Sequence, residues 1–479
     1  MSHYVGIDLG TTSITVLALD TKSREVLGHE TIANDTEITS ADDRLRGRSE
    51  WDMDQMMSQV FKVLRRISDR YSNSCPLEGI GVTGQQHGMV LLDERFRPQG
   101  PFIGWQDRRC LDKDDNGKTY LDHMYSMGGH EFLHSEYLPA RGYMGATLFW
   151  LSQTGQLPGR LQASFAPDYL VGRLCGEQPA TDTTNASGSG LFDVVNGVWN
   201  ETLIEKIGLQ KNVLPLIQAP CTLAGHLTAK SAHESGLPVG TPITVACGDN
   251  QASFAGSVAE YEDSVLVNIG TGGQVSVYST DPIRMDGLLV RPYLKSGYLL
   301  VGAGLTGGRA YGIWEQFIRL VGAQVFGIKD DDHLYIRLNE LAEAASGSGT
   351  LHCDPVFMGS LIDPMRRGAW SGIDDTNLTP GNMTRSLLEG MAEQFKMTYD
   401  TMLSNGVVKR TRLIGAGNGV RKNPLLSHIL SDAFRLPVQI VRHTEEAAFG
   451  AALCASVASG EFEDVEAAGK ACNQYDQLT

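Results

Sequence analysis

The sequence has no excess of positive charge. Lys and Arg number 40 against 56 Asp and Glu, which gives a formal net charge of −16 over 479 residues. A nucleic-acid-binding protein needs a basic surface to neutralise phosphates, so this balance argues against a nucleic-acid partner. It does not exclude a nucleotide ligand, because the charge of one pocket is independent of the total.

Long apolar runs and paired cysteine motifs are also missing. No apolar run approaches the roughly 18 residues of a membrane helix, so we expect no membrane association. The eight cysteines are scattered without a Cys-x-x-Cys pair, which argues against structural zinc and a disulfide framework. A strand pattern starts at Tyr4 and leaves no room for a signal peptide. We therefore expect a cytoplasmic protein with reduced thiols.

The composition that is present is typical of a globular protein with more than one domain. Hydrophobic residues make up 42% and charged residues 20% of the chain. A chain of 479 residues is long for a single core, so two or three domains are expected. No short-period repeat or low-complexity segment occurs. We expect the protein to be a monomer or a homodimer.

Two segments far apart in the chain share a strand–turn–strand pattern. Apolar, β-branched strands are predicted at residues 4–7 and 14–19, and again at 264–268 and 274–278. The turns between them consist of small and hydroxyl-bearing residues: Gly10, Thr11, Thr12 and Ser13 in the first, and Gly270, Thr271 and Gly272 in the second. Glycine allows close approach to a ligand, and hydroxyl and N–H groups suit phosphate oxygens. We predict a duplicated α/β fold that binds one polyphosphate with both turns.

The remaining patterns divide the chain into an expected first domain, residues 1–248, and a second, residues 249–479. Further strands are predicted at 79–84, 88–92, 243–247 and 298–302, and helices at 53–67 and about 384–403. The polar, Gly/Ser-rich residues 182–200 are predicted to form an ordered loop over a site.

A third glycine-rich turn holds Gly415, Gly417 and Asn418, between an apolar strand that starts at Leu413 and a helix after Asn423. Alone, such a run predicts only a tight turn. After the two phosphate turns, it suggests close approach of a ribose or a flat ring, with the helix N-terminus adding partial positive charge.

Six motifs follow one another along the chain: residues 6–13 (GIDLGTTS), 84–88 (GQQHG), 105–108 (WQDR), 248–251 (GDNQ), 268–272 (NIGTG) and 415–418 (GAGN). In these motifs and their order, the chain resembles the FGGY carbohydrate kinases over essentially its whole length. The resemblance implies an α/β fold of two ribonuclease-H-like (actin/hexokinase/Hsp70 ATPase) domains with an interdomain cleft. The sugar is then expected against the first domain and ATP mainly against the second, where Gly307 and Gly308 join the ATP-binding residues.

Phosphoryl transfer to a sugar hydroxyl needs positioned phosphates, a divalent cation and a carboxylate that takes the hydroxyl proton. Asp249 is the candidate base, because it follows strand 243–247 and opens a predicted helix that favours its ionised form. The alternative is a plain N-cap. Asp8 ends the first strand and is the candidate ligand for Mg²⁺, which takes few carboxylates; the alternative is a turn-initiating Asp.

The same resemblance implies a polar sugar site in the first domain. Its candidate residues are amides, an imidazole, a carboxylate and one aromatic ring: Gln85, Gln86, His87, Trp105, Gln106, Asp107 and Asn250. Neutral donors and acceptors suit polyols, since each hydroxyl both gives and takes a hydrogen bond. The alternatives are a polar cluster that caps the strand end and, for Trp105, a simple core role.

Within the family, Trp105-Gln106-Asp107 and residues 142–151 are most similar to sedoheptulokinases, whereas Gly248-Asp249-Asn250 is similar to xylulokinases. We therefore predict an ATP-dependent ketose kinase that acts on sedoheptulose. Xylulokinase, or another FGGY kinase for a pentulose or polyol, stays open as an alternative. A non-catalytic actin/Hsp70-like ATP-binding module and an inactive sugar sensor are the alternatives from other classes.

Overall fold

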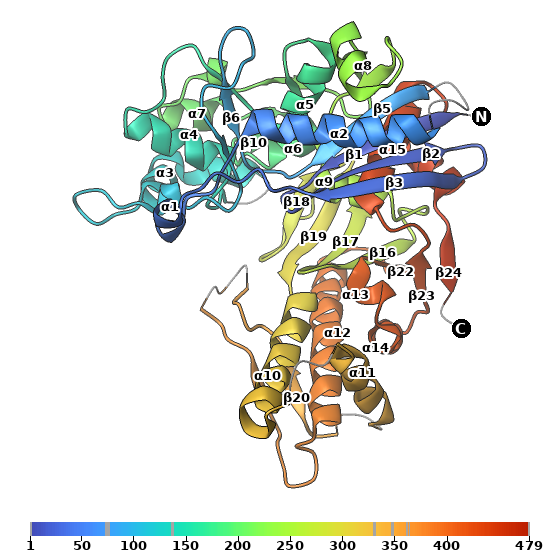
Figure 1. Ribbon diagram of the computed structural model, residues 1–479. Helices are drawn as coiled ribbons and strands as arrows, with labels where there is room; N and C mark the ends of the chain where they lie inside the picture. The colour runs from blue at the N-terminus through green and yellow to red at the C-terminus, as the bar shows by residue number, and fades with distance from the viewer. Residues whose placement is uncertain are drawn as a thin grey trace. The chain divides into compact units, whose positions relative to one another are not determined.

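The computed structural model describes residues 2–71, 77–135, 138–328, 332–345, 349–360, 363 and 365–477. The chain forms two compact units, each with helices around its own sheet (Figure 1). The first unit contains the chain up to Ala259 together with Val290–Tyr298 and Glu445–Asn473; the second contains Glu260–Leu289, Leu299–Thr444 and the chain from Gln474 onwards. The first unit therefore extends beyond residue 248, and it also includes two segments from later in the chain.

The first unit is built on a seven-stranded sheet in the order β13-β14-β5-β1-β2-β3, with β15 also paired to β5. The strands are β1 (His3–Leu9), β2 (Ser13–Asp20), β3 (Glu25–Ala33), β5 (Leu77–Gly84), β13 (Leu223–His226), β14 (Pro242–Thr244) and β15 (Cys247–Gly248). β1 and β2 are antiparallel, so the turn predicted to bind phosphate joins them. β5 runs parallel to β1, and β15 runs parallel to β5. The carboxyl ends of β1, β5 and β15 therefore meet at one edge.

Some of the helices of this unit pack on the sheet, and others pack on one another. The helices are α1 (Ala41–Leu45), α2 (Met53–Tyr71), α3 (Tyr120–Gly128), α4 (Met144–Gln153), α5 (Ala166–Cys175), α6 (Thr183–Ser187), α7 (Glu201–Lys206), α8 (Ala229–Ser235), α9 (Asp249–Ala255), α15 (Glu446–Ala458) and α16 (Val465–Cys472). The apolar side of α2 packs on β2 and β3. Helix α15 packs on β1, β5 and α9. Its close approach requires Gly6 and Gly81, where a Cβ would overlap the carbonyl groups of Ala448 and Ala451.

Short strand pairs complete the first unit. These strands are β4 (Glu50–Trp51) with β7 (Phe102–Ile103), β6 (Val90–Leu92) with β8 (Gln162–Ser164), β9 (Ala180–Asp182) with β12 (Leu216–Gln218), and β10 (Phe192–Asp193) with β11 (Val198–Trp199). The β4–β7 pair sets the loop that carries Trp105 beside the segment around Ser49.

The second unit has its own seven-stranded sheet, which includes the order β19-β17-β16-β22-β23-β24. Its strands are β16 (Ser264–Ile269), β17 (Gly273–Ser279), β19 (Tyr298–Leu305), β22 (Arg412–Ala416), β23 (Val438–Val441) and β24 (Tyr475–Gln477), with β18 (Leu289–Pro292) before β19 and a β20 (His352–Asp354)–β21 (Ala369–Ser371) hairpin outside the sheet. Its helices are α10 (Gly308–Phe326), α11 (Leu334–Ala344), α12 (Pro380–Ser404), α13 (Asn418–Arg421) and α14 (Pro424–Phe434). As in the first unit, an antiparallel hairpin, β16–β17, lies beside a parallel neighbour, β22.

The predicted α/β fold with one sheet in each of two domains is confirmed. Two local predictions were wrong. The strand expected at 243–247 is interrupted and forms β14 and β15. The loop expected over 182–200 contains helix α6 and the β10–β11 hairpin, because Asp182 caps α6 by accepting a hydrogen bond from the backbone N–H of Asn185.

The sequence predicts neither a membrane-spanning helix nor a disulfide framework, and the described residues bear on both expectations. None of their helices is both long and apolar enough to span a bilayer. The seven cysteines in the described part of the chain are free thiols, and Cys75 lies outside it.

Candidate active site

The carboxyl ends of three strands bring the candidate catalytic and sugar residues together. Leu9 of β1 and Gly248 of β15 both align with Gly84 of β5, so the residues near or after these ends share one edge of the sheet. Asp8, Gln85 and Asp249 therefore converge, although 241 positions separate Asp8 from Asp249 in sequence.

Asp249 is the first residue of α9, and Gly248 occupies the N-cap position without a side-chain cap. The Asp249 carboxylate is therefore not used as the N-cap that sequence reasoning offered as an alternative. Its Oδ1 accepts a hydrogen bond from the backbone N–H of Asn250 at 2.7 Å. Burial raises the pKa of Asp249, while the positive charge of Arg291 and the Asn250 N–H oppose the rise.

Asp8 lies beside Asp249 and has an unsatisfied oxygen. Burial, together with the negative charges of Asp249 and Glu445, raises the pKa of Asp8 to about 7. Its Oδ1 is buried with no hydrogen-bond partner. A buried carboxylate oxygen that lacks a donor and faces other carboxylates fits a cation, which would relieve both costs. No cluster of three or more His, Cys, Asp or Glu side chains with metal-site geometry occurs in the described ranges.

Gln85 and Gln86 are both buried, but their amides are used differently. Gln85 Oε1 accepts from the Thr11 hydroxyl at 3.2 Å, and its Nε2 has no partner. Gln86 Nε2 donates to the carbonyl of Thr184 at 2.9 Å, and its Oε1 accepts from Arg291 Nη1 at 3.1 Å. Gln86 is thus held by the protein on both sides of its amide.

His87 adopts a positive φ of 76°, which turns the chain sharply after β5. Its ring stacks on Tyr143 with centroids 4.2 Å apart and an interplanar angle of 11°. His87 Nδ1 lies 2.7 Å from the carbonyl oxygen of Gly188, and since a carbonyl only accepts, Nδ1 carries a proton. These contacts fix the imidazole at the candidate sugar side.

Trp105 and Gln106 are exposed, with Trp105 showing 43% of its surface. The Trp105 indole N–H donates to Thr11 Oγ1 at 2.8 Å. The predicted sugar-facing Trp105 therefore contacts the first phosphate turn directly and is not a core residue.

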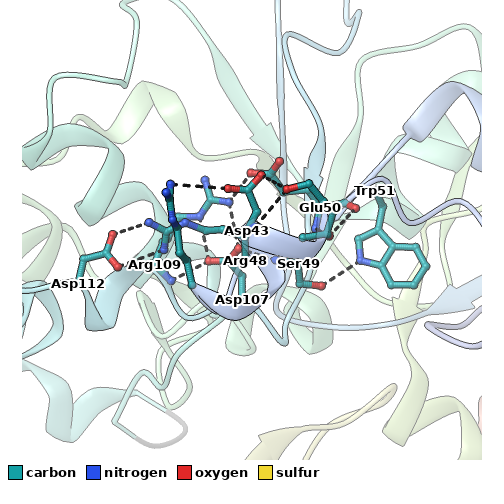
Figure 2. Close-up of polar contacts among 11 residues, drawn as sticks. Asp43, Arg48, Ser49, Glu50, Trp51, Asp107, Arg109 and Asp112 are labelled. Atoms are coloured by element: carbon teal, nitrogen blue, oxygen red, sulfur yellow. Dashed lines mark hydrogen bonds and ion pairs between the residues drawn. The ribbon is translucent and has the colours of Figure 1, made fainter.

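Asp107 is buried, and Figure 2 shows the polar contacts around its carboxylate. Its Oδ1 accepts from the backbone N–H and Nε of Arg109 at 2.8 and 2.9 Å, and its Oδ2 accepts from the Ser49 N–H at 2.9 Å and Arg109 Nη2 at 3.0 Å. Arg109 also pairs with Glu50 at 2.7 Å and lies over the Trp150 ring. With four donors on its carboxylate, Asp107 supports the turn that carries Trp105. A direct contact with sugar stays a prediction.

The predicted ATP-binding residues of the second unit lie close together. The Gly308 N–H donates to the Gly270 carbonyl at 2.9 Å, and Gly307 packs so closely on Gly272 that a Cβ would overlap it. Gly417 has φ +80°, and a Cβ there would lie 2.5 Å from the Ile269 carbonyl oxygen. Three glycine-rich turns from distant parts of the sequence, the third including Gly415 and Asn418, thus gather near the end of β16.

The first phosphate turn is braced within the first unit. Asn34 Nδ2 donates to the Gly10 carbonyl at 2.9 Å, and the Asn34 N–H donates to the Thr12 carbonyl at 3.0 Å. The Thr12 side chain is exposed, and Ser13 begins β2. These two hydrogen bonds fix the shape of the turn, and its contact with phosphate stays a prediction.

Sequence reasoning did not identify four residues that organise this site. Tyr143 stacks on His87, Arg291 holds Gln86, and Thr184 accepts from the Gly248 N–H at 2.8 Å through its hydroxyl. Asp182, fully buried, in turn accepts from the Thr184 hydroxyl. Tyr143, Thr184 and Arg291 lie 56, 64 and 205 positions from their partners His87, Gly248 and Gln86, so no local pattern could have revealed them.

Comparison with known proteins places this chain in one family. Residues 3–256 match the N-terminal domain of the FGGY family of carbohydrate kinases, and residues 265–459 match its C-terminal domain. Sedoheptulokinase of Mus musculus is 26% identical over 94% of this chain and 96% of its own length, and xylulose kinase of Staphylococcus xylosus is 24% identical over 100% and 95%. The crystal structure of xylulose kinase from Rhodospirillum rubrum superimposes with a TM-score of 0.85 at 22% identity, covering 100% of this chain and 94% of that one. The chain belongs to the FGGY family of carbohydrate kinases.

Proposed function

We propose that this carbohydrate kinase phosphorylates a ketose with ATP, converting sedoheptulose to sedoheptulose 7-phosphate, with Asp249 as the general base. The observation that carries the proposal is the meeting of Asp249, Asp8 and Gln85 at one edge of the first sheet. The similarity to mouse sedoheptulokinase and the Trp105-Gln106-Asp107 motif support the choice of sugar.

Asp249 has the environment that a general base requires. A base must be ionised at the working pH and still attract a proton. Its position at the N-terminus of α9, the Asn250 N–H and the nearby Arg291 favour the ionised form, while burial strengthens its attraction for the proton. Asp249 would take the proton from the sugar hydroxyl as that oxygen bonds to the terminal phosphorus of ATP, while the bond from this phosphorus to the bridging oxygen breaks and ADP leaves.

Asp8 is the residue that would hold Mg²⁺, because its buried Oδ1 has no donor. When bound with ATP, Mg²⁺ supplies charge neutralisation on the phosphate oxygens. The backbone of residues 10–13 and the glycine turns of the second unit would position the phosphates and the nucleoside. Sugar-side contacts would come from Gln85, His87, Trp105 and Gln106, with Asn250 adjoining the base.

Xylulose is the second candidate substrate. Asn250 after Asp249 is similar to xylulokinases, and the Staphylococcus xylosus xylulose kinase aligns with the entire chain. A non-catalytic ATP-binding module would have no use for a base together with a sugar side, so the candidate residues for both argue against it.

A panel of ketoses and polyols, assayed with ATP and Mg²⁺ for ADP formation, tests the proposal. We expect sedoheptulose to give the highest kcat/KM, with phosphate on the terminal hydroxyl of the product. If xylulose were the better substrate, the sedoheptulose assignment would be wrong. If no sugar stimulated ADP formation, the kinase proposal itself would fail.

A further inference from the structure

A chain of hydrogen bonds joins the first phosphate turn to the candidate sugar side. The Trp105 indole N–H donates to Thr11 Oγ1 at 2.8 Å, and Thr11 Oγ1 donates to Gln85 Oε1 at 3.2 Å. The three residues come from the loop after β7, the β1–β2 turn and the end of β5. All three belong to the first compact unit.

These bonds commit the Thr11 hydroxyl to protein partners. A hydroxyl has one proton to donate, and Thr11 gives it to Gln85 while accepting from Trp105. A phosphate oxygen offers no proton, so it could bind this hydroxyl only by taking the proton away from Gln85. The side chain of Thr12 differs, because it is exposed and has no hydrogen-bond partner among the described residues.

The same chain fixes the orientation of Gln85. With Oε1 turned to Thr11, the Nε2 group is left buried and without a partner, in a residue that is only 3% exposed. An unpaired buried donor is costly, and a ligand oxygen that satisfies it gains the corresponding free energy. A sugar presents hydroxyl oxygens that can accept from this amide.

We propose that the Thr11 hydroxyl is a positioning group for the sugar, which aims the Trp105 indole and the Gln85 amide, and that it is not a ligand of the nucleotide phosphates. The proposal deepens the sugar-kinase function given above and rests on it. It assigns the sugar contact to Gln85 Nε2 and the phosphate-facing hydroxyl of this turn to Thr12.

The test is a comparison of KM values for sugar and for ATP in matched variants. Thr11→Val removes the hydroxyl with little change in volume, Thr11→Ser retains it, and Thr12→Val is the control one residue along. We expect Thr11→Val to raise the KM for sedoheptulose about tenfold, because Gln85 and Trp105 lose their shared partner, with the KM for ATP within about twofold of wild type. Thr11→Ser should recover the sugar KM, and Thr12→Val should shift mainly the KM for ATP.

A rise in the ATP KM of Thr11→Val that equals or exceeds the rise for sugar would overturn the proposal, as would no change in either. Should Thr11→Val fold poorly, Trp105→Phe removes the donor at the exposed end of the chain. It should raise the sugar KM, and Thr11→Ser in that background should restore nothing. If the wild-type enzyme turned over none of the sugars in the panel, the kinase function itself would be refuted. This outcome distinguishes a failure of the proposed function from a failure of the proposal for Thr11.

Discussion

The Asp107 carboxylate offers a sharp test of whether this residue supports the site or reads the sugar. Asp107→Asn keeps the side-chain shape and removes the charge. The Asp107 carboxylate accepts all four of its hydrogen bonds, three from N–H groups of Arg109 and one from the backbone N–H of Ser49. The Asn amide nitrogen, itself a donor, must therefore face at least one N–H group.

The expected effect is large because Arg109 is buried. Its side chain is 7% exposed and that of Asp107 is fully buried. Burial lowers the pKa of Arg109, but its bonds to Asp107 and Glu50 outweigh this and leave the pKa above its ordinary value. Removing one partner of such a buried pair costs about 3–5 kcal/mol of unfolding free energy, and the partly exposed Glu50 would compensate only in part.

Urea denaturation of wild type and Asp107→Asn, followed by circular dichroism, measures this cost. Asp93→Asn is the matched control, because Asp93 also accepts several bonds from an arginine, Arg97, but in an exposed pair. We expect its effect to be much smaller. If Asp107→Asn were as stable as wild type and only the KM for sugar rose, our structural interpretation of Asp107 would be wrong.

Three further predictions concern separate parts of the chain. Gly417→Ala should lower the unfolding free energy by more than about 1 kcal/mol and raise the KM for ATP, because its φ is +80° and its Cβ would meet the Ile269 carbonyl; unchanged melting and ATP kinetics would refute this. Burial raises the pKa of Asp182 to about 7. Between about pH 4 and pH 7 the native state therefore keeps a proton on Asp182 that the unfolded chain releases, so the free energy of unfolding should fall as the pH rises through this range. Asp182→Asn keeps the capping oxygen and cannot ionise, so its stability relative to wild type should increase between pH 5 and pH 8, by about 3 kcal/mol; a pH-independent difference in urea denaturation would contradict it. Gln106→Asn should lower kcat/KM for sedoheptulose more than for xylulose, by about 1–3 kcal/mol in transition-state binding. An equal loss for both sugars would show that Gln106 does not discriminate between sugars of different length.

The parts of the fold that follow from short-range pattern were predictable from sequence. The β1–β2 and β16–β17 hairpins combine β-branched strands with Gly/Thr turns, and α2 has a clear helical period, so each carries its own signal. Helix α15 has no such signal, because consecutive residues from Ala448 to Ser456 are buried and no polar face marks the period. The short helix α6 was predicted to be a loop, because Thr, Asn and Ser favour turns, and the helix is stabilised by its buried cap, Asp182, and by packing on strands distant in sequence.

The candidate site was predictable as a set of motifs but not as a network. Strand ends and glycine turns predicted the candidates Asp8, Asp249 and the phosphate turns, since these predictions depend on local sequence. The support of Gln86 by Arg291 and of Asp107 by Arg109 depends on side-chain packing, which periodicity does not encode. Asp107 and Arg109 are only two positions apart, but the sequence does not show that the Asp107 carboxylate is buried. Burial is what distinguishes a carboxylate that supports the fold from one that faces solvent.

The most direct test of the central claim is the turnover of Asp249→Asn with sedoheptulose, ATP and Mg²⁺, combined with calorimetric measurement of sugar and ATP binding. If Asp249 is the general base, kcat should fall about 10²- to 10⁴-fold while both ligands still bind. Turnover within a few-fold of wild type would contradict the account and leave Asp249 as only the first residue of a helix.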